Sequence, residues 1–347
     1  MTNYVDWKFA TSAGTRLVPP GPDVSPEEAV EAVEEIRALA GQAVEPVAAT
    51  SRLRAPGDAP APLVIDRRTW IEVNATSMAG MLDPAFEAAS RRKTKEPSAA
   101  AQAVGSKITG AEAGGMLAFL STKVLGQYDL APEGDPALLL VAPNIVATER
   151  DIDAVPRDFR LWVCLHEETH RVQFTAVPWL RDHLVTSARS LAGDLMPDSE
   201  ALRTRLEQVA TQLPRVFSGD SQGLAELVIT PEQRERMAQV TAVMSLLEGH
   251  ADVVMDDVGP EHVPTVATIR ARFTKRRKGA GAVDRLLRRL LGLEAKMRQY
   301  RDGATFVRTV QDAVGVDGFN AVWTSPETLP TAREITEPAA WVQRVHG

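Results

Sequence analysis

Apolar residues recur at intervals of three and four along most of the chain, which is the period of an amphipathic helix. A first helix is expected over residues 25–41, where Ser25 and Glu28 can form a capping box and Gly41 follows the last apolar position. Residues 230–256 open with the same kind of box and carry a longer helical pattern. The pattern therefore predicts a mainly helical chain.

Two places interrupt this pattern with short runs suited to β-strands. Residues 63–65 are Leu-Val-Ile and precede Asp66, which can cap the next helix. Residues 136–150, PALLLVAPNIVATER, hold two apolar runs separated by Pro143 and Asn144, which predicts a pair of strands. We expect a small sheet in a mainly α (α+β) fold, with LLLVAPN either an edge strand that binds extended peptide or a buried core strand.

Residues 161–174, LWVCLHEETHRVQF, combine a core-facing apolar stripe with two histidines on another face. His166 and His170 are one helical turn apart, about 6 Å of rise, so both imidazoles can reach a single cation. In a chain of this composition, an accidental H-E-x-x-H is expected only about 0.014 times. The motif thus indicates a zinc site more strongly than a chance match on a charged helix.

A catalytic zinc site needs a third protein ligand and one position left for water. Glu248, in the segment LLEGHADVVMD, is the favoured ligand. Asp252 shares its helix face and could accept a hydrogen bond from a metal-bound histidine, although both could instead belong to a solvated acidic face. His250 points to another side of the same helix and is either a polar group near the reacting oxyanion or a surface histidine.

The remaining chemistry can be assigned around Glu167, which follows the first histidine and is the natural general base for a zinc-activated water. Tyr300 is a candidate oxyanion donor, with a packed amphipathic tyrosine as the alternative. Glu168 is expected to be solvated or ion-paired. Cys164 has no evident activator and is expected to be a small buried residue.

Composition narrows the choice of partners and compartment. The chain has 347 residues, a net charge of -7 and one cysteine, which excludes an intramolecular disulfide and a multi-thiolate metal site. The acidic balance argues against nucleic acid as the main partner, and the basic run at residues 275–278 suits the end of a helix. Because the chain has neither a leader-like start nor a long apolar run, we expect a cytoplasmic protein that does not enter the membrane.

The H-E-x-x-H helix followed by E-x-x-x-D on a later helix resembles the gluzincin class of metallopeptidases. More closely, the chain resembles a bacterial family of zincin-like metallopeptidases, sometimes labelled as hydrolases associated with deazaflavin coenzyme biosynthesis. The likeness extends over almost the whole chain, including PNIVATERDID, DFRLWVCLHEETHRVQFTAVPWLRDHL and KMRQYRDGATFVRTVQDAVGVDGFNAVWTSPETLP. It implies a zincin fold with His166, His170 and Glu248 as ligands and Glu167 as base. It implies no particular substrate, and the sequence has no flavin-binding pattern.

These observations lead to one main hypothesis and two rivals. We expect a single catalytic domain over residues 1–347, with one lobe over about 1–185 and a helical lobe over about 186–347. Its function would be zinc-dependent hydrolysis of a peptide or amide, with one zinc ion. One rival is a binding or scaffold protein whose zinc is structural or a relic, with His250 or Asp252 as a fourth ligand. The other rival is a hydrolase of small amides.

Overall fold

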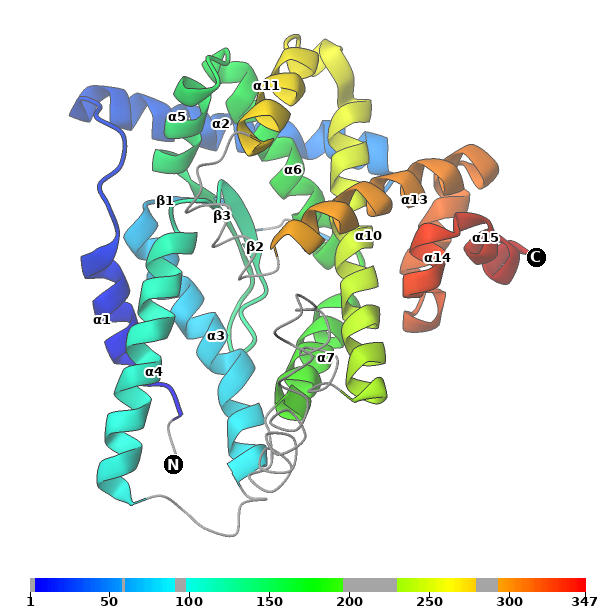
Figure 1. The fold of residues 1–347 in the computed structure, drawn as a ribbon. Coiled ribbons are helices and arrows are strands. Elements are labelled where there is room, and N and C mark those ends of the chain that lie inside the picture. Colours follow the sequence, from blue (N-terminus) through cyan, green and yellow to red (C-terminus); the bar gives the residue numbers. More distant parts are fainter. Residues whose placement is uncertain (1–3, 58–59, 91–97, 196–229, 279–292) are drawn as a thin grey trace, which may run out of the picture.

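The computed structural model describes residues 4–57, 60–90, 98–195, 230–278 and 293–347 (Figure 1). Its elements are α1 (Trp7–Leu17), α2 (Pro26–Ser51), β1 (Leu63–Ile65), α3 (Arg67–Ser90), α4 (Ala99–Leu120), β2 (Gly126–Asp129), β3 (Ala137–Val141), α5 (Ala142–Asp151), α6 (Pro156–Ala176), α7 (Leu180–Leu195), α10 (Pro231–His262), α11 (Val266–Lys278), α13 (Leu293–Phe319), η1 (Asn320–Trp323), η2 (Pro326–Thr328), α14 (Ala332–Thr336) and α15 (Pro338–His346). The mainly α fold with a small sheet is confirmed. The division into two lobes stays a prediction.

The sheet has three strands in the order β1-β3-β2, in the middle of the molecule (Figure 1). Strand β1 pairs with β3 in parallel, and β2 pairs with β3 in antiparallel fashion, with Gly126 opposite Leu140. The strand expected at residues 63–65 is confirmed. Of the two alternatives for LLLVAPN, the buried core strand is confirmed and the peptide-binding edge strand is wrong, because β3 is the central strand and Leu138 to Val141 are buried. Among the described strands, the edges are β1 and β2.

The expectation of a second strand within residues 136–150 is also wrong. The chain passes directly from β3 into helix α5. Pro143 stands in the first turn of that helix, where its missing N–H costs nothing and its fixed φ favours helix. Asn144 does not form a turn either. Its buried amide donates to the carbonyl oxygens of Ser121 and Val124, at 2.6 Å each, and so ties α5 to the end of α4.

Helix α2 begins with the predicted capping box, since the side chain of Ser25 accepts from the backbone N–H of Glu28 and that of Glu28 from Ser25. It does not end at Gly41, as the pattern suggested, but continues to Ser51. Ala43 and Val47 of this extension are buried in the core that α2 shares with α6. Their burial outweighs the cost of about 1 kcal/mol that glycine imposes inside a helix.

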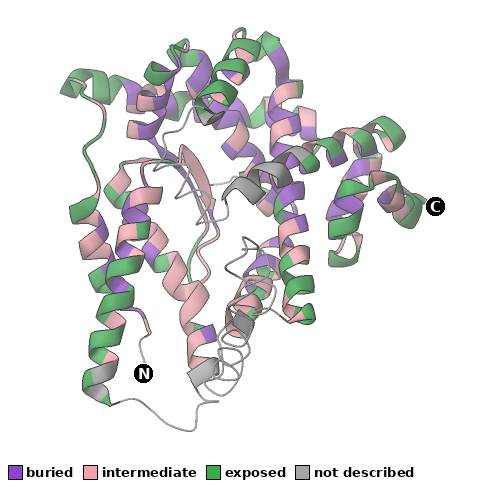
Figure 2. Ribbon diagram, viewed as in Figure 1, coloured by how far each residue is buried: buried purple, intermediate pink, exposed green. Residues whose placement is uncertain are grey.

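Helix α6, which carries the H-E-x-x-H motif, lies at the centre of the molecule. Figure 2 shows buried residues concentrated along it and along β3. The predicted apolar stripe is buried, but so are polar residues on its other faces, including Glu167, Glu168 and Gln173. Helices α2 and α10 and strand β2 pack around it. Each buried polar group on α6 therefore needs a partner inside the protein.

Helix α10 begins with the predicted capping box of Thr230 and Gln233 and runs past the expected end to His262. It crosses α13 where Gly249 and Gly303 meet backbone to backbone. A methyl group on Gly303 would lie 1.9 Å from the carbonyl oxygen of Ser245, which only glycine avoids. The close crossing holds the middle of α10 against α13, one residue from Glu248.

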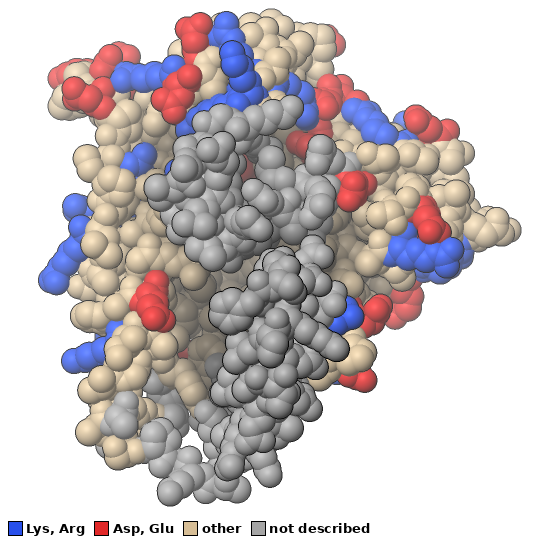
Figure 3. Space-filling view, viewed as in Figure 1, with Lys and Arg blue, Asp and Glu red and all other residues tan. Residues whose placement is uncertain are grey.

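The surface carries both signs of charge, as Figure 3 shows for one face. Part of the basic run at 275–278 pairs with acidic residues at the end of α5. Arg276 reaches Asp151 at 3.0 Å, and Arg272, on the same helix, reaches Asp153 at 3.0 Å. These basic residues thus help to fasten α11 to α5. Within the described residues, no helix is both long and apolar enough to cross a membrane.

Candidate metal centre

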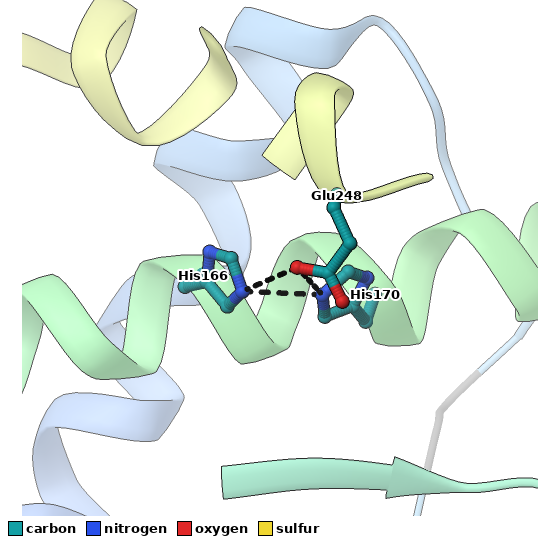
Figure 4. A group of neighbouring side chains, drawn as sticks. All are labelled: His166, His170 and Glu248. Atoms are coloured by element: carbon teal, nitrogen blue, oxygen red, sulfur yellow. Dashed lines mark hydrogen bonds and ion pairs between the residues drawn. The ribbon is translucent and has the colours of Figure 1, made fainter. Parts of the chain in front are cut away.

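Helix α6 turns His166 and His170 toward the same point. Their rings lie edge to face, with centroids 4.8 Å apart, and their Nε2 atoms are separated by 3.2 Å (Figure 4). The spacing of four residues brings the second histidine slightly more than one full turn after the first. Two nitrogens that both offer lone pairs would repel at this distance, so the arrangement calls for a cation or a proton between them.

Glu248 reaches the same point from α10, as Figure 4 shows. Its Oε2 atom lies 3.5 Å from Nε2 of His166 and 3.8 Å from Nε2 of His170. Ligands bound tetrahedrally to zinc at about 2.0–2.1 Å are separated by about 3.3 Å. The three distances therefore fit three corners of a zinc tetrahedron. Within the described part of the chain, this is the one group of three or more His, Cys, Asp or Glu side chains close enough to hold a metal ion.

The three side chains are electrically coupled. Burial alone would lower the pKa of His170, but the Glu248 carboxylate overrides this effect and raises that pKa to about 9. Burial acts to raise the pKa of Glu248, yet His170 and His166 bring it well below its usual range. Without a metal, the site thus favours an added proton. A divalent cation would satisfy the same negative potential and displace that proton.

Glu167 lies beside this centre but is more deeply buried, with 6% of its surface exposed. Burial raises the pKa of its carboxyl, while the two histidines act in the opposite direction. Its carboxylate rests against Gly126 of β2, where a methyl group would lie 2.6 Å from Cδ of Glu167. Only a glycine leaves room for the carboxylate. The sequence analysis assigned Gly126 no role, and the available signal was a glycine at the start of a short strand, which often marks a close approach.

Gln173 is a site residue to which the sequence pattern assigned no role. Its Oε1 lies 3.0 Å from Nδ1 of His170, and its Nε2 lies 2.9 Å from the carbonyl oxygen of Leu247 and 3.0 Å from Nδ1 of His250. The available signal was its position three residues after His170, on the same helix face.

His250 occupies neither of the two expected positions. It is fully buried and contacts the rings of Phe319 and Trp323, with centroids 5.3 and 5.4 Å away. The structure therefore places this histidine in the core behind Gln173 and not at the surface.

Asp252 does not accept a hydrogen bond from His170, because Gln173 holds that position. Its carboxylate instead lies 3.6 Å from Nη2 of Arg270 on α11. Asp252 lies one helical turn after Glu248 but faces α11. Sharing a helix face with Glu248 therefore did not bring Asp252 to the histidines. The backbone of Tyr300 belongs to α13, but its side chain lies outside the described residues, so its role stays a prediction.

The other two predicted side chains behave as expected. Cys164 is a free, buried cysteine, and burial raises the pKa of its thiol. Glu168 is ion-paired. Its two oxygens accept from Nε and Nη2 of Arg171 at 2.7 and 2.8 Å, with both side chains nearly buried.

Comparison with known proteins agrees with this geometry. A crystal structure from Chloroflexus aurantiacus, described as "a putative hydrolase with a novel fold", aligns over 99% of both chains with 29% sequence identity and a TM-score of 0.69. No protein of curated function matches. The family model for zincin-like metallopeptidases matches residues 5–342, which suggests a zinc hydrolase with His166, His170 and Glu248 as the possible metal site. The chain therefore belongs to the zincin-like metallopeptidase family.

Proposed function

We propose that the protein is a zinc-dependent peptidase that binds one zinc ion through His166, His170 and Glu248. The observation that carries the proposal is the convergence of these three side chains at distances close to those of a zinc tetrahedron. All three are partly exposed, with 13 to 24% of each side chain accessible, so the centre can be reached from outside the core.

The chemistry follows from Glu167 and its surroundings. When bound, zinc supplies a water of lowered pKa and polarises the substrate carbonyl. Glu167 takes the proton from the attacking water and delivers it to the leaving nitrogen. Burial, by raising the pKa of this carboxyl, makes it a better proton acceptor than a surface glutamate. Its fixed position against Gly126 keeps it beside the centre.

A structural zinc site would need a fourth protein ligand. The two residues named as candidates for it are engaged elsewhere, since His250 lies behind Gln173 and Asp252 pairs with Arg270. Among the described residues, the metal-binding group consists of three side chains. This supports a centre with a position open to water over a scaffold with a closed site.

A peptide is favoured over a small amide because β2 lies beside the base. This strand is an edge of the described sheet, and its first residue, Gly126, contacts Glu167. An extended peptide that pairs with β2 through its backbone would pass alongside the metal centre. The peptide-binding edge is thus β2 and not the LLLVAPN segment.

The proposal is tested with purified wild-type protein, Glu167→Gln and a matched surface variant, Glu235→Gln on α10. Elemental analysis measures zinc per chain, and mass spectrometry follows cleavage of a mixed peptide library. We expect one zinc in all three proteins and a loss of cleavage of at least about 100-fold in Glu167→Gln alone, because a general base contributes that much. Equal turnover by wild type and Glu167→Gln would remove Glu167 from the mechanism.

The same samples separate the rival functions. If the protein hydrolyses small amides but leaves the peptides uncleaved, its function is that of a small-amide hydrolase and not of a peptidase. Bound zinc without hydrolysis of either, together with a fourth protein ligand at the metal, would support the scaffold.

A further inference from the structure

We propose that Gln173 is a positioning residue that sets the protonated nitrogen of His170 and couples the two helices that carry the metal ligands. The inference rests on the proposed zinc site but concerns a residue that is not itself a metal ligand. Gln173 is fully buried and touches His170 on its own helix and α10 on the other side.

The orientation of the Gln173 amide follows from its partners. The carbonyl oxygen of Leu247, 2.9 Å away, can only accept, so the amide nitrogen of Gln173 must face it. The opposite orientation would bring two oxygens together inside the core. The amide oxygen of Gln173 therefore faces His170.

This orientation determines the state of His170. An amide oxygen can only accept, so Nδ1 of His170 must carry a hydrogen and donate it over 3.0 Å. In the neutral imidazole, the lone pair then belongs to Nε2, which is the atom that faces His166 and Glu248. Gln173 thus selects the tautomer that can bind a metal through Nε2, and it also restrains rotation of the ring.

His250 completes the chain of hydrogen bonds. The second N–H of the Gln173 amide points at Nδ1 of His250 over 3.0 Å, so that nitrogen must accept. His250 is therefore neutral, with its hydrogen on Nε2. The full burial of this ring supports the assignment, since a charged imidazolium would be costly in the core. Phe319 and Trp323 hold the ring in place from behind.

The contacts of Gln173 with α10 lie on both sides of the third ligand. Leu247 precedes Glu248 and His250 follows it by two residues, and both bond to the same amide nitrogen. A single side chain of α6 therefore restrains the turn of α10 that carries Glu248. Movement of α10 relative to α6 would strain the hydrogen bonds from Gln173 to Leu247 and His250.

The first test compares wild type with Gln173→Met, which keeps the length of the side chain and removes every hydrogen bond. The matched control is Thr169→Val, a buried polar-to-apolar change on α6, whose hydroxyl donates only to Leu165 of the same helix. Zinc affinity is measured by competition with a chromophoric chelator. We expect Gln173→Met to weaken binding by about 10- to 100-fold, as is typical when a partner of a metal ligand is lost, and the control to change it by less than about threefold.

The second test uses a readout that general loss of packing does not change. Two-bond ¹H–¹⁵N spectra report which nitrogen of each histidine carries the hydrogen. In metal-free wild type, His250 is expected to be the Nε2–H tautomer. In Gln173→Glu, a carboxylate replaces the donor, and His250 is expected to switch its hydrogen to Nδ1. In the zinc form of the wild type, His170 should show a hydrogen on Nδ1 that is protected from exchange.

These results distinguish the inference from the proposed function. If wild type binds zinc through three ligands while Gln173→Met binds it equally well, the positioning role fails and the peptidase proposal stands. If wild type binds no zinc, the proposed function fails, and the tautomer of His250 in the metal-free protein still tests the hydrogen-bond chain. An Nδ1–H tautomer of His250 in wild type would overturn the inference.

Discussion

Glu167 shows how the position of one side chain depends on the absence of a side chain at a distant residue, Gly126. The carboxylate occupies the space in which any other residue at position 126 would place its Cβ atom. The atoms nearest to Gly126 belong to the end of the flexible Glu167 side chain. A larger residue at position 126 would therefore displace that side chain and not the backbone of β2. The fold should therefore tolerate a change at Gly126 better than the chemistry does.

We predict that Gly126→Ala loses at least about 100-fold in peptide cleavage, since its methyl group displaces the base from the attacking water. Zinc affinity should change by less than about threefold, because none of the three ligands is touched. The control is Gly41→Ala, an exposed position of α2 with open space around it, which should keep full activity and gain up to about 1 kcal/mol of stability. Full activity of Gly126→Ala would show that Glu167 does not work from its present position.

At this scale, the sequence predicted that the side chains of His166 and His170 would lie together. His166, Glu167 and His170 could be recognised because their spacing is fixed by the helix itself. The partner of His170 was expected to be Asp252, on the ground of a shared helix face with Glu248. Gln173 reaches His170 within α6, but its amide is held by Leu247 and His250 of α10, and a pattern within one segment does not record that contact.

Among the elements, α10 matters most, because it presents Glu248 to α6 on one side and packs closely on α13 on the other. The close crossing is possible because Gly249 and Gly303 face each other. A side chain at either glycine would force the two helices apart, because the nearest atoms belong to the backbone of the facing helix and cannot move aside as a side chain can.

We predict that Gly303→Ala destabilises the protein by at least about 2 kcal/mol, since overpacking against a rigid backbone cannot be relieved by a rotamer change. Zinc affinity should also fall, because α10 moves and carries Glu248 with it. Gly115→Ala in α4, where an added methyl group meets no atom within 4 Å, serves as the matched control. Urea unfolding and chelator competition measure the two effects. Equal stability of the two variants would contradict the tight crossing.

The elements themselves were predictable where local signals agreed. Capping boxes marked the starts of α2 and α10, because they satisfy backbone N–H groups within four residues. These local signals gave the wrong element or the wrong end where burial against other elements determined the structure. Helix α2 continues past Gly41 because its later residues pack on α6, and Pro143 begins a helix where a turn between strands was expected.

For the whole molecule, the metal centre joins parts of the chain far apart in sequence. The histidines come from α6 and the glutamate from α10, and one hydrophobic core contains residues of both helices together with α2, α5 and α11. Stability and the state of the site should therefore be linked, in the metal-free protein most of all, where His170 and Glu248 depend on each other.

We predict a pH effect on the stability of the metal-free protein. The pKa of His170 in the fold, about 9, lies above its ordinary value of 6.5, so its contribution is complete below pH 6.5 and is lost as the pH rises toward 9. The pKa of Glu248 is lowered, so its contribution is present above pH 4.5 and is lost in more acidic solution. The pair therefore stabilises the fold most between about pH 4.5 and pH 6.5, where Glu248 is ionised and His170 is protonated.

Thermal unfolding with a chelator present tests this expectation. The difference in Tm between wild type and Glu248→Gln should shrink by several degrees between pH 6.5 and pH 9. With saturating zinc, the wild type should lose this pH dependence over the same range, because the metal replaces the proton. Parallel Tm curves for wild type and variant without metal would contradict the coupling.

The sequence by itself determined the helical character, the helix that carries the H-E-x-x-H motif and the family resemblance, because these depend on periodicity, capping and spacing within one segment. Tertiary structure alone decided that β2 and not β3 forms an edge, that Gly126 makes room for Glu167, and that Gln173 lies between His170 and His250. The physical reason is that burial and hydrogen-bond satisfaction are settled between elements, whereas a sequence pattern records only the preferences of each element alone.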